Sequence, residues 1–397
     1  MTRWRLDVGP AGQRPTHPLS TAATRSFTFN LSEPSTATFT IDARSADGQR
    51  IEELATDVHL LRDGVPLYTG RVLSTADSID DTAHTLTVSC TDLRGVLARR
   101  HTRTRRDWTK GVPAGRAVRD LLREAQAAPY TSLGFDVPDF TDGATVERDV
   151  LAGQSILGEL QALAGGVEGG SSVFDWDVSP GWRDRTAQLW APTRGRDLTG
   201  PGGLTLQYRQ ARPGARTPAF GTISRGFDPA TYANVLTLTG GSRRVPRTTV
   251  DPSTGETVIE VIDVPTEPVT LTDSDAITAL GAWSAAEAYP DLTTQAEVRT
   301  KARQRFDELR RTAASWTFPL RLGLWQGPRT LWLGDTVRVV VTSGRLREDL
   351  ALRVTQLTLA LDSTGREQVA VTAGPPPRDY LTELVAAKRR LAALEQH

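Results

Sequence analysis

The chain has 397 residues, and its 47 basic and 47 acidic side chains give a formal charge of zero. A balanced charge excludes a whole-molecule field that attracts nucleic acid or an anionic membrane, so any electrostatic role is local. The single cysteine, Cys90, excludes an intrachain disulfide and a cysteine-based metal site, and we expect it to be buried as a small apolar side chain.

The first 98 residues are predicted to form a β domain, because apolar and polar residues alternate between turn signals such as Asp47-Gly48 and Asp63-Gly64. A short helical turn is expected at Asp92–Leu97. The predicted strands are Ser26–Asn30, Thr36–Ile41, Asp57–Leu61, Val65–Leu73 and Thr85–Cys90.

Residues 99–215 are predicted to form an α+β insertion. Pro113–Gln126 and Gln154–Leu163 each carry apolar residues at helical spacing. Three short strands are expected to follow, at Phe174–Val178, Ala187–Trp190 and Leu204–Arg209.

Residues 216–312 are predicted to form a mixed domain with a strand at Asn234–Leu238 and a hairpin from Thr248–Val250 to Val258–Val264. It ends with a helix at Thr294–Thr312, where Thr294 and Glu297 match a capping box. A second β meander follows at 313–375, with alternating apolar residues in Val337–Val341 and Leu357–Leu361. Two meanders at the two ends of the chain suggest an internally duplicated scaffold.

Pro375-Pro376-Pro377 is expected to end the globular part, since successive prolines cannot extend a strand ladder. Residues 376–397 are predicted to be a helix whose apolar stripe fits a coiled-coil seam of about two heptads. A helix this short is marginal alone in water, so it packs on the body of the protein or on copies of itself. The stripe consists of Leu381, Leu384, Val385, Leu391 and Leu394.

No sequence pattern in the chain indicates a catalytic, metal-binding or phosphate-binding site. The five histidines lack metal-ligand spacing, and no nucleophile elbow or phosphate-binding glycine loop occurs between a strand and a helix. Adjacent acidic residues, Glu52-Glu53 and Asp80-Asp81, are typical of solvent-facing turns. We therefore predict a protein that is not an enzyme, with no catalytic, cofactor-binding or metal-binding residue.

One basic loop stands out, and it contains Arg99, Arg100, Arg103, Arg105 and Arg106. Such a cluster meets DNA phosphate or an acidic partner, or is simply solvated, and the last two interpretations are favoured because no matching basic face exists elsewhere. Nine tryptophans suit either large interfaces or a sugar-binding platform. No N-terminal signal pattern and no run of roughly eighteen apolar residues occurs, so we expect synthesis in the cytoplasm and no membrane span.

Several segments, taken in order, resemble the hub protein of phage tail tips and baseplates, also called the tail-associated or minor tail protein of siphophages. The segments that carry the resemblance are Phe27–Leu31, Thr38–Ile41, Asp57–Gly64, Tyr68–Val72, Thr87–Arg99, Ser155–Leu160, Phe174–Asp177, Tyr232–Leu238, Leu331–Val339 and Arg353–Leu357.

The resemblance implies a mainly β fold with α+β insertions, in which two related small β-barrel-like domains per subunit form a pseudo-sixfold ring in a homotrimer. It implies a virion protein of the tail tip, assembled in the host cytoplasm, that joins the tail tube or distal tail protein to further tip or fibre proteins. The ring would enclose a channel for DNA in transit and for the tape-measure protein. Many members of this family carry a long C-terminal fibre, sugar-binding or peptidase extension, whereas this chain stops at residue 397, so a minimal hub ring is expected.

Two other functions stay open from the sequence. The tryptophans and acidic pairs are also compatible with a carbohydrate-binding or cell-wall-cleaving tail protein. A hub of a contractile injection machine shares the same expected fold and differs only in its neighbours.

Overall fold

In the computed structural model the chain is mostly β, which confirms the predicted fold class. The structure describes residues 3–31, 33–108, 110–127, 132–146, 148–164, 174–182, 185–191, 193–209, 222–227, 232–250, 257–289, 292–310, 314–320, 325–362 and 365–374. They fall into two compact units: unit 1 takes in the described residues up to 164, from 174 to 226 and from 315 to 374, and unit 2 those from 227 to 314. The predicted C-terminal helix lies outside the described residues, and the domain boundaries at 98, 215, 312 and 375 stay a prediction.

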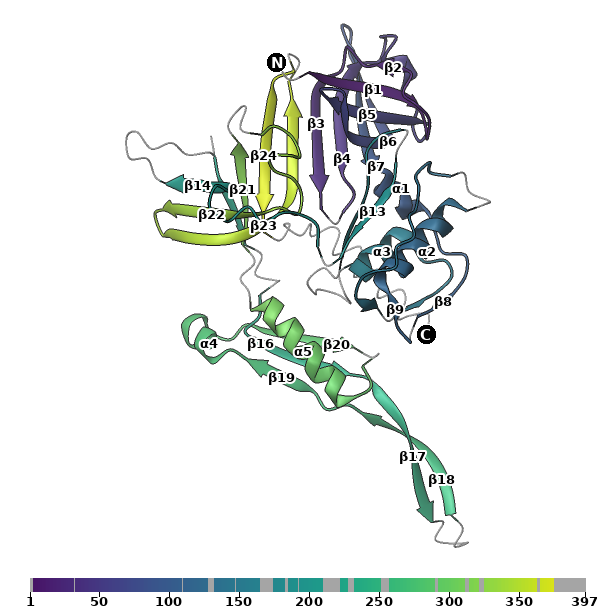
Figure 1. Ribbon diagram of the computed structural model, residues 1–397, viewed down its shortest axis with the longest axis vertical. Helices are drawn as coiled ribbons and strands as arrows, with labels where there is room; N and C mark the ends of the chain where they lie inside the picture. Colours follow the sequence, from purple (N-terminus) through teal and green to yellow (C-terminus); the bar gives the residue numbers. More distant parts are fainter. Residues whose placement is uncertain are drawn as a thin grey trace. The chain divides into compact units, whose positions relative to one another are not determined.

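The described part of unit 1 is built on one 13-stranded sheet (Figure 1). Its strand order is β15-β21-β24-β23-β3-β4-β7-β6-β5-β1-β2, while β14 pairs with β22 and β22 with β23. The strands are β1 (Trp4–Pro10), β2 (His17–Pro18), β3 (Ala23–Asn30), β4 (Thr36–Asp42), β5 (Thr56–Arg62), β6 (Val65–Ile79), β7 (His84–Asp92), β14 (Thr205–Arg209), β15 (Ser224–Phe227), β21 (Ala314–Leu320), β22 (Thr336–Ser343), β23 (Leu346–Leu361) and β24 (Glu367–Ala373).

The two predicted meanders meet in this sheet, where β3 and β23 lie side by side (Figure 1). Their ladder places Leu357 opposite Phe29 and Leu359 opposite Phe27, and all four side chains are buried. The ends of the chain therefore form one continuous core instead of two separate sheets.

The two meanders have the same strand order, as the predicted duplication requires. In chain order the strands of the first are β4, β5, β6 and β7, and in space they run β4-β7-β6-β5. The second repeats this arrangement as β21-β24-β23-β22. A further strand flanks each repeat on the same side, β3 beside β4 and β15 beside β21.

Register also agrees between the two repeats. Each has a row of three small or apolar residues across its first, last and third strands, and each shifts register directly after that row. The rows are Ala37, Cys90 and Val72 in one repeat and Trp316, Ala373 and Val354 in the other, and the shifts fall between Val72 and Ser74 and between Val354 and Gln356. The repeats therefore align residue by residue along these strands.

Sequence periodicity missed two features of the sheet. Strand β1 has four consecutive buried residues, so it shows no period-two alternation. Strand β6 was predicted to end at Leu73 but continues to Ile79. The prediction stopped short because the added residues are mostly polar and exposed and so show no apolar alternation.

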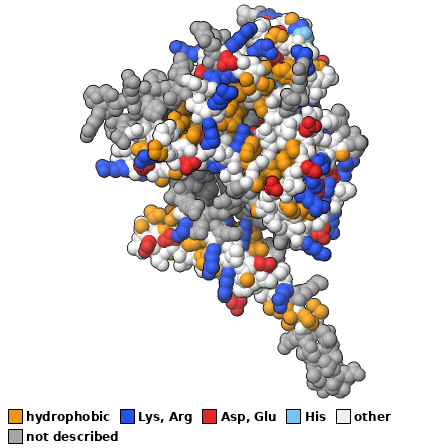
Figure 2. Space-filling view, in the orientation of Figure 1, with side chains coloured by type: hydrophobic (Ala, Val, Ile, Leu, Met, Phe, Trp, Pro, Cys, Tyr) orange, Lys and Arg blue, Asp and Glu red, His pale blue; other side chains and the backbone are white. Residues whose placement is uncertain are grey.

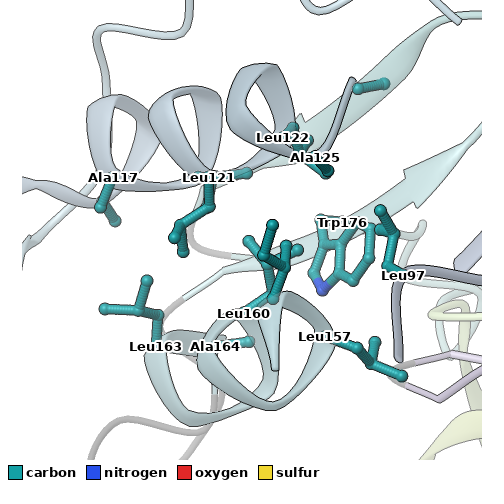
Figure 3. Packing of buried hydrophobic residues seen from close by; sticks show 14 of the residues in the cluster. Leu97, Ala117, Leu121, Leu122, Ala125, Leu157, Leu160, Leu163, Ala164 and Trp176 are labelled. Atoms are coloured by element: carbon teal, nitrogen blue, oxygen red, sulfur yellow. The ribbon is translucent and has the colours of Figure 1, made fainter. Parts of the chain in front are cut away.

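The insertion packs two helices against a short hairpin, β12-β13 (Figure 3). Leu121 and Leu122 of one helix meet Leu160 and Leu163 of the other, with Trp176 completing the core. Two short helices lead into the insertion, α1 (Leu93–Val96) and η2 (Leu97–Arg99). Its own elements are β8 (Arg106–Asp107), β9 (Val112–Pro113), α2 (Ala114–Gln126), β10 (Thr145–Val146), β11 (Asp149–Val150), α3 (Ile156–Ala164), β12 (Asp175–Val178) and β13 (Ala187–Trp190); a short η1 (Gly48–Arg50) lies in the first meander.

Unit 2 is a three-stranded sheet, β19-β16-β20, covered by a helix, and it carries a long two-stranded hairpin, β17-β18 (Figure 1). The predicted capping box is present, since Thr294 N donates to Glu297 Oε2 at 3.0 Å and Glu297 N donates to Thr294 Oγ1 at 3.4 Å. Its elements are β16 (Val235–Gly240), β17 (Ser242–Val250), β18 (Thr257–Pro265), β19 (Val269–Thr272), α4 (Ser274–Leu280), β20 (Ser284–Tyr289) and α5 (Gln295–Leu309). One face of α5 is apolar and buried, and it consists of Val298, Ala302, Phe306 and Leu309.

Candidate functional site: ion pairs that join the insertion to the sheet

The predicted basic loop is bound to the insertion by acidic partners. Arg105 pairs with Asp149 at 2.6 Å, and Arg106 pairs with Glu124 of α2 at 2.7 Å. Glu124 also accepts a hydrogen bond from the main-chain N–H of Arg103 at 2.5 Å. Arg99 and Arg103 are exposed and Arg100 is half-buried. Contact of this loop with DNA or with a protein partner stays a prediction.

Acidic and basic side chains alternate over the neighbouring surface. Arg119 pairs with Asp120 and Asp139, each at 3.0 Å, and Arg123 pairs with Asp139 at 3.2 Å. Figure 2 shows blue and red side chains intermixed over this part of unit 1. A surface that neutralises itself in this way provides little field for a phosphate backbone.

A buried ion pair begins where β7 passes into α1. Asp92 caps α1 by accepting the N–H of Gly95 at 3.1 Å, and it also accepts the N–H of Ser35 at 2.9 Å. Arg94 Nε donates to the same carboxylate at 2.9 Å. Burial raises the pKa of Asp92, while Arg94 opposes the rise by favouring the carboxylate. Further donations from Arg94 go to Ser35 Oγ at 2.8 Å, Asn30 O at 3.1 Å and Leu31 O at 3.3 Å.

From Arg94 the charges continue into the β12-β13 hairpin. Arg94 Nε lies 3.5 Å from Asp177 Oδ1, and Arg194 Nη1 donates to Asp177 Oδ2 at 2.7 Å. Arg353 of β23 then binds the carboxylate of Asp175 and donates to the main-chain oxygen of Arg194 at 2.8 Å. The alternating series Asp92, Arg94, Asp177, Arg194, Asp175 and Arg353 therefore links both repeats through the insertion.

A parallel link joins the insertion to the second repeat directly. Arg196 makes a two-point contact with Asp335, with Nε at 3.2 Å from Oδ1 and Nη2 at 2.6 Å from Oδ2. Its own N–H donates to the same carboxylate at 2.8 Å, and its Nη1 donates to Arg329 O at 2.7 Å. Such two-point pairs fix orientation as well as distance.

The first repeat has a corresponding buried link. Asp57 of β5 accepts from Arg71 of β6 at 3.0 Å, and its other oxygen lies 3.5 Å from Arg185 of the insertion. Beside this pair, His59 Nδ1 is 3.0 Å from Thr69 Oγ1. Burial and the nearby Arg185 lower the pKa of His59 to about 4, so the ring is neutral at physiological pH.

These links hold the fold together and are not arranged for catalysis. Each carboxylate in them is engaged by arginine or main-chain N–H groups, and burial raises the pKa of the Cys90 thiol. Among the described residues no group of three or more His, Cys, Asp or Glu side chains is placed to hold a metal ion. Within the same residues, no helix has both the length and the apolar character needed to cross a membrane.

Five of the nine tryptophans pack inside unit 1. Trp316 and Trp325 are buried, and Trp182, Trp190 and Trp332 are half-buried. The Trp325 ring stacks on that of Trp332 with centroids 6.3 Å apart, and Arg194 lies 4.4 Å from the Trp190 ring centroid. None of the five is an exposed sugar-binding surface.

Sequence reasoning missed the ion-pair series because its members are far apart in the chain. Arg353 and Asp175 are 178 residues apart, and Arg196 and Asp335 are 139 apart. The available local signals were the charged residues at strand ends, such as Asp92 as the last residue of β7 and Asp335 directly before β22. Those signals do not identify the partner.

No protein-family model matches the chain, and no curated protein matches it in sequence. Solved structures do match. The tail protein from Neisseria meningitidis MC58 aligns with a TM-score of 0.60 at 13% identity, covering 94% of this chain and 97% of its own. The 43 kDa tail protein of prophage MuSo2 from Shewanella oneidensis aligns with a TM-score of 0.56 at 12% identity, covering 93% and 98%.

A third match is the prophage tail protein gp18 from Listeria monocytogenes EGD-e, with a TM-score of 0.52 at 10% identity, covering 99% of this chain and 100% of its own. All three alignments extend over nearly the whole of both chains. The chain therefore has the fold of phage tail proteins, as the sequence resemblance implied.

Proposed function

We propose that this chain is the structural hub protein of a phage tail tip. The observation that carries the proposal is the repeated meander: two copies of one strand order and register, joined in a single sheet through β3 and β23. The fold that the chain shares with three phage tail proteins supports a role in a phage tail for this duplicated scaffold.

A chain with two similar repeats is suited to join a sixfold assembly to a threefold one. Three copies of a chain with two similar repeats present six similar units around one axis, and cyclic assembly repeats each patch around that axis. The homotrimer would thus offer a pseudo-sixfold face to the tail tube or distal tail protein and a threefold face to further tip or fibre proteins. Its centre is the proposed channel for the tape-measure protein and for DNA in transit.

The proposed role needs no reactive group. The buried ion pairs join the insertion to both repeats, so that the assembled surfaces keep a fixed relative position within unit 1. Binding to partners then comes from interface burial, which is the usual source of affinity between structural subunits. We propose a virion location at the tail tip, after assembly in the host cytoplasm.

Two segments are proposed as additional contacts. The apolar stripe of the C-terminal segment would form a seam between copies or bind the next tip protein. The basic loop from Arg99 to Arg106 would meet a protein partner or line the path of DNA.

The test is the mass of the purified chain together with two-dimensional class averages of negatively stained particles. The expected mass is about 129 kDa, three times the 43.1 kDa of one chain, and the expected particle is a ring with six similar lobes. A glycan-binding and cell-wall hydrolysis assay on the same sample should be negative. A monomer both alone and mixed with its tail-tube partner, or turnover of cell wall, would refute the proposal.

A further inference from the structure

Unit 1 has two strand edges without a strand partner among the described residues. Strand β6 pairs with β5 along Val65–Arg71 and with β7 along Gly70–Ile79, so the other side of Ser74–Ile79, here called the outer edge of β6, is open. Strand β15 pairs with β21 and ends the strand order on the opposite side. Open edges expose unpaired main-chain N–H and C=O groups and are templates for pairing with another chain.

The outer edge of β6 also exposes apolar surface. Ile79 is 72% exposed, and Leu73, the residue directly before this edge, is 43% exposed. The equivalent strand of the second repeat differs sharply, since Leu357, Leu359 and Leu361 of β23 are all buried. Strand β23 has β3 as its neighbour along these residues, whereas Ser74–Ile79 of β6 has no described strand there.

The repeat alignment identifies what covers this edge in the second repeat. Because Val72 corresponds to Val354 and a register shift follows both, Ser74–Ile79 corresponds to Gln356–Leu361. In the second repeat those residues pair with β3, from Asn30 opposite Gln356 to Arg25 opposite Leu361. The second repeat therefore has a strand, β3, paired at the position where the first repeat has an open edge.

The strand equivalent to β3 is β15, since each flanks the first strand of its repeat. Thr28 of β3 lies opposite Thr36, one residue before Ala37. In the other repeat, a Cβ built on Gly226 of β15 would lie 2.7 Å from Ser315 Oγ, and Ser315 is one residue before Trp316. Ala37 and Trp316 are equivalent, so we assign Gly226 to the place of Thr28. With β15 taken to run antiparallel to β21, as β3 does to β4, Ser224 is assigned to the place of Ser26.

We propose that β15 of one copy pairs antiparallel with the outer edge of β6 of a second copy, and so repeats between chains the joint that β3 and β23 make within one chain. This proposal rests on the hub function proposed above and names the surface through which the copies join. The contact is head-to-tail, and each copy has one donor strand and one acceptor edge. Such a contact closes into a ring when the rotation permits, leaving neither edge open.

The transferred register makes the contact specific at residue level. Ser26 lies opposite Ala360 in the intrachain joint, so Ser224 of one copy should lie opposite Ser78 of the next. One residue further, Arg225 lies opposite Asp77; Arg225 pairs with Glu348 at 3.2 Å and Asp77 with His84 at 2.6 Å within each chain. Opposite charges directly across an antiparallel pair are favourable.

Two matched double variants test the register in the full-length chain. Directly opposite residues have Cα atoms close enough for a disulfide, so Ser78→Cys with Ser224→Cys should cross-link copies under mild oxidation. The control, Ser74→Cys with Ser224→Cys, makes an equally small change at another exposed serine of the same strand, but four residues away, about 13 Å out of register. Native Cys90 is buried and its thiol has a raised pKa, so it does not compete.

On a non-reducing gel, most of the Ser78→Cys/Ser224→Cys chains should run as covalent dimers and trimers that collapse to monomer with reductant, whereas the control stays mostly monomeric. A native trimer without that cross-link, or with equal cross-linking in both variants, overturns the strand pairing and leaves the hub proposal standing. A monomer by mass with no cross-link at any protein concentration, with or without the tail-tube partner, overturns both.

Discussion

Replacing Arg94 with methionine should destabilise the protein far more than an equivalent change at the surface. Arg94 is 3% exposed and donates hydrogen bonds to Asp92, to Ser35 Oγ and to two main-chain oxygens, of Asn30 and Leu31. Methionine has a similar length and no donor. The change leaves a buried carboxylate without its cation, which typically costs about 3–5 kcal/mol. That is a large share of the roughly 5–15 kcal/mol that holds a domain folded.

Arg338→Met is the matched control. Arg338 makes a two-point pair with Asp349, at 2.7 Å and 2.5 Å, which is at least as short as the Arg94 pair. Both partners are about half exposed, at 51% and 53%. Water and salt screen a pair of this kind, so its loss should leave the free energy of unfolding unchanged within error.

The measurement is equilibrium unfolding in urea at neutral pH, followed by tryptophan fluorescence and by circular dichroism. Two probes are needed because the chain has two units, and a single transition cannot be assumed. Buried Trp316 and Trp325 report on unit 1. If Arg94→Met lowers the free energy of unfolding by less than about 1 kcal/mol, or by no more than the control does, the buried pair does not stabilise the fold as argued.

The pKa of His59 is about 4 in the folded protein and near 6.5 in an unfolded chain, so the unfolded state takes up a proton first as the pH is lowered. The free energy of unfolding should therefore decrease as the pH falls from about 6.5 to about 4, by up to about 1.4 kcal/mol per pH unit. His59→Asn should flatten that fall in urea titrations repeated across this range; an unaltered slope would contradict it. Leu160→Ala in the buried insertion core should lower the free energy of unfolding by about 2–5 kcal/mol, whereas exposed Leu151→Ala should leave it nearly unchanged in the same assay, and equal losses would count against the core assignment. Leu384→Glu with Leu391→Glu should reduce the mass measured by light scattering if the C-terminal stripe is a seam between copies, and an unchanged mass would remove that seam.

Local pattern was sufficient where an element is stabilised by its own sequence neighbours. The helix at 114–126 was predicted to within one residue because its apolar positions recur at helical spacing. Helix α5 begins at the predicted capping box, and alternation located the main strands of both meanders. The burial of Cys90 followed from the same alternation and is confirmed.

Local pattern failed where a neighbour distant in sequence decides the outcome. The last residues of β6 are mostly polar, and pairing with β7 holds them in a strand. Strand β1 is buried on both faces, so its residues do not alternate. The exposed arginines of the basic loop looked like a single positive patch, and acidic partners from α2 and β11 engage Arg105 and Arg106.

The sequence by itself determined the positions of most strands and helices, the presence of two similar meanders and the lack of a recognisable catalytic pattern. The tertiary structure alone decided that the meanders form one sheet, that their registers agree, and that alternating Asp and Arg residues join the insertion to both. The physical reason is the sequence distance over which each interaction acts. Periodicity and capping act over a few residues, whereas the Arg353–Asp175 pair joins residues 178 apart and the β3-β23 ladder joins residues still further apart, so their approach depends on the whole fold.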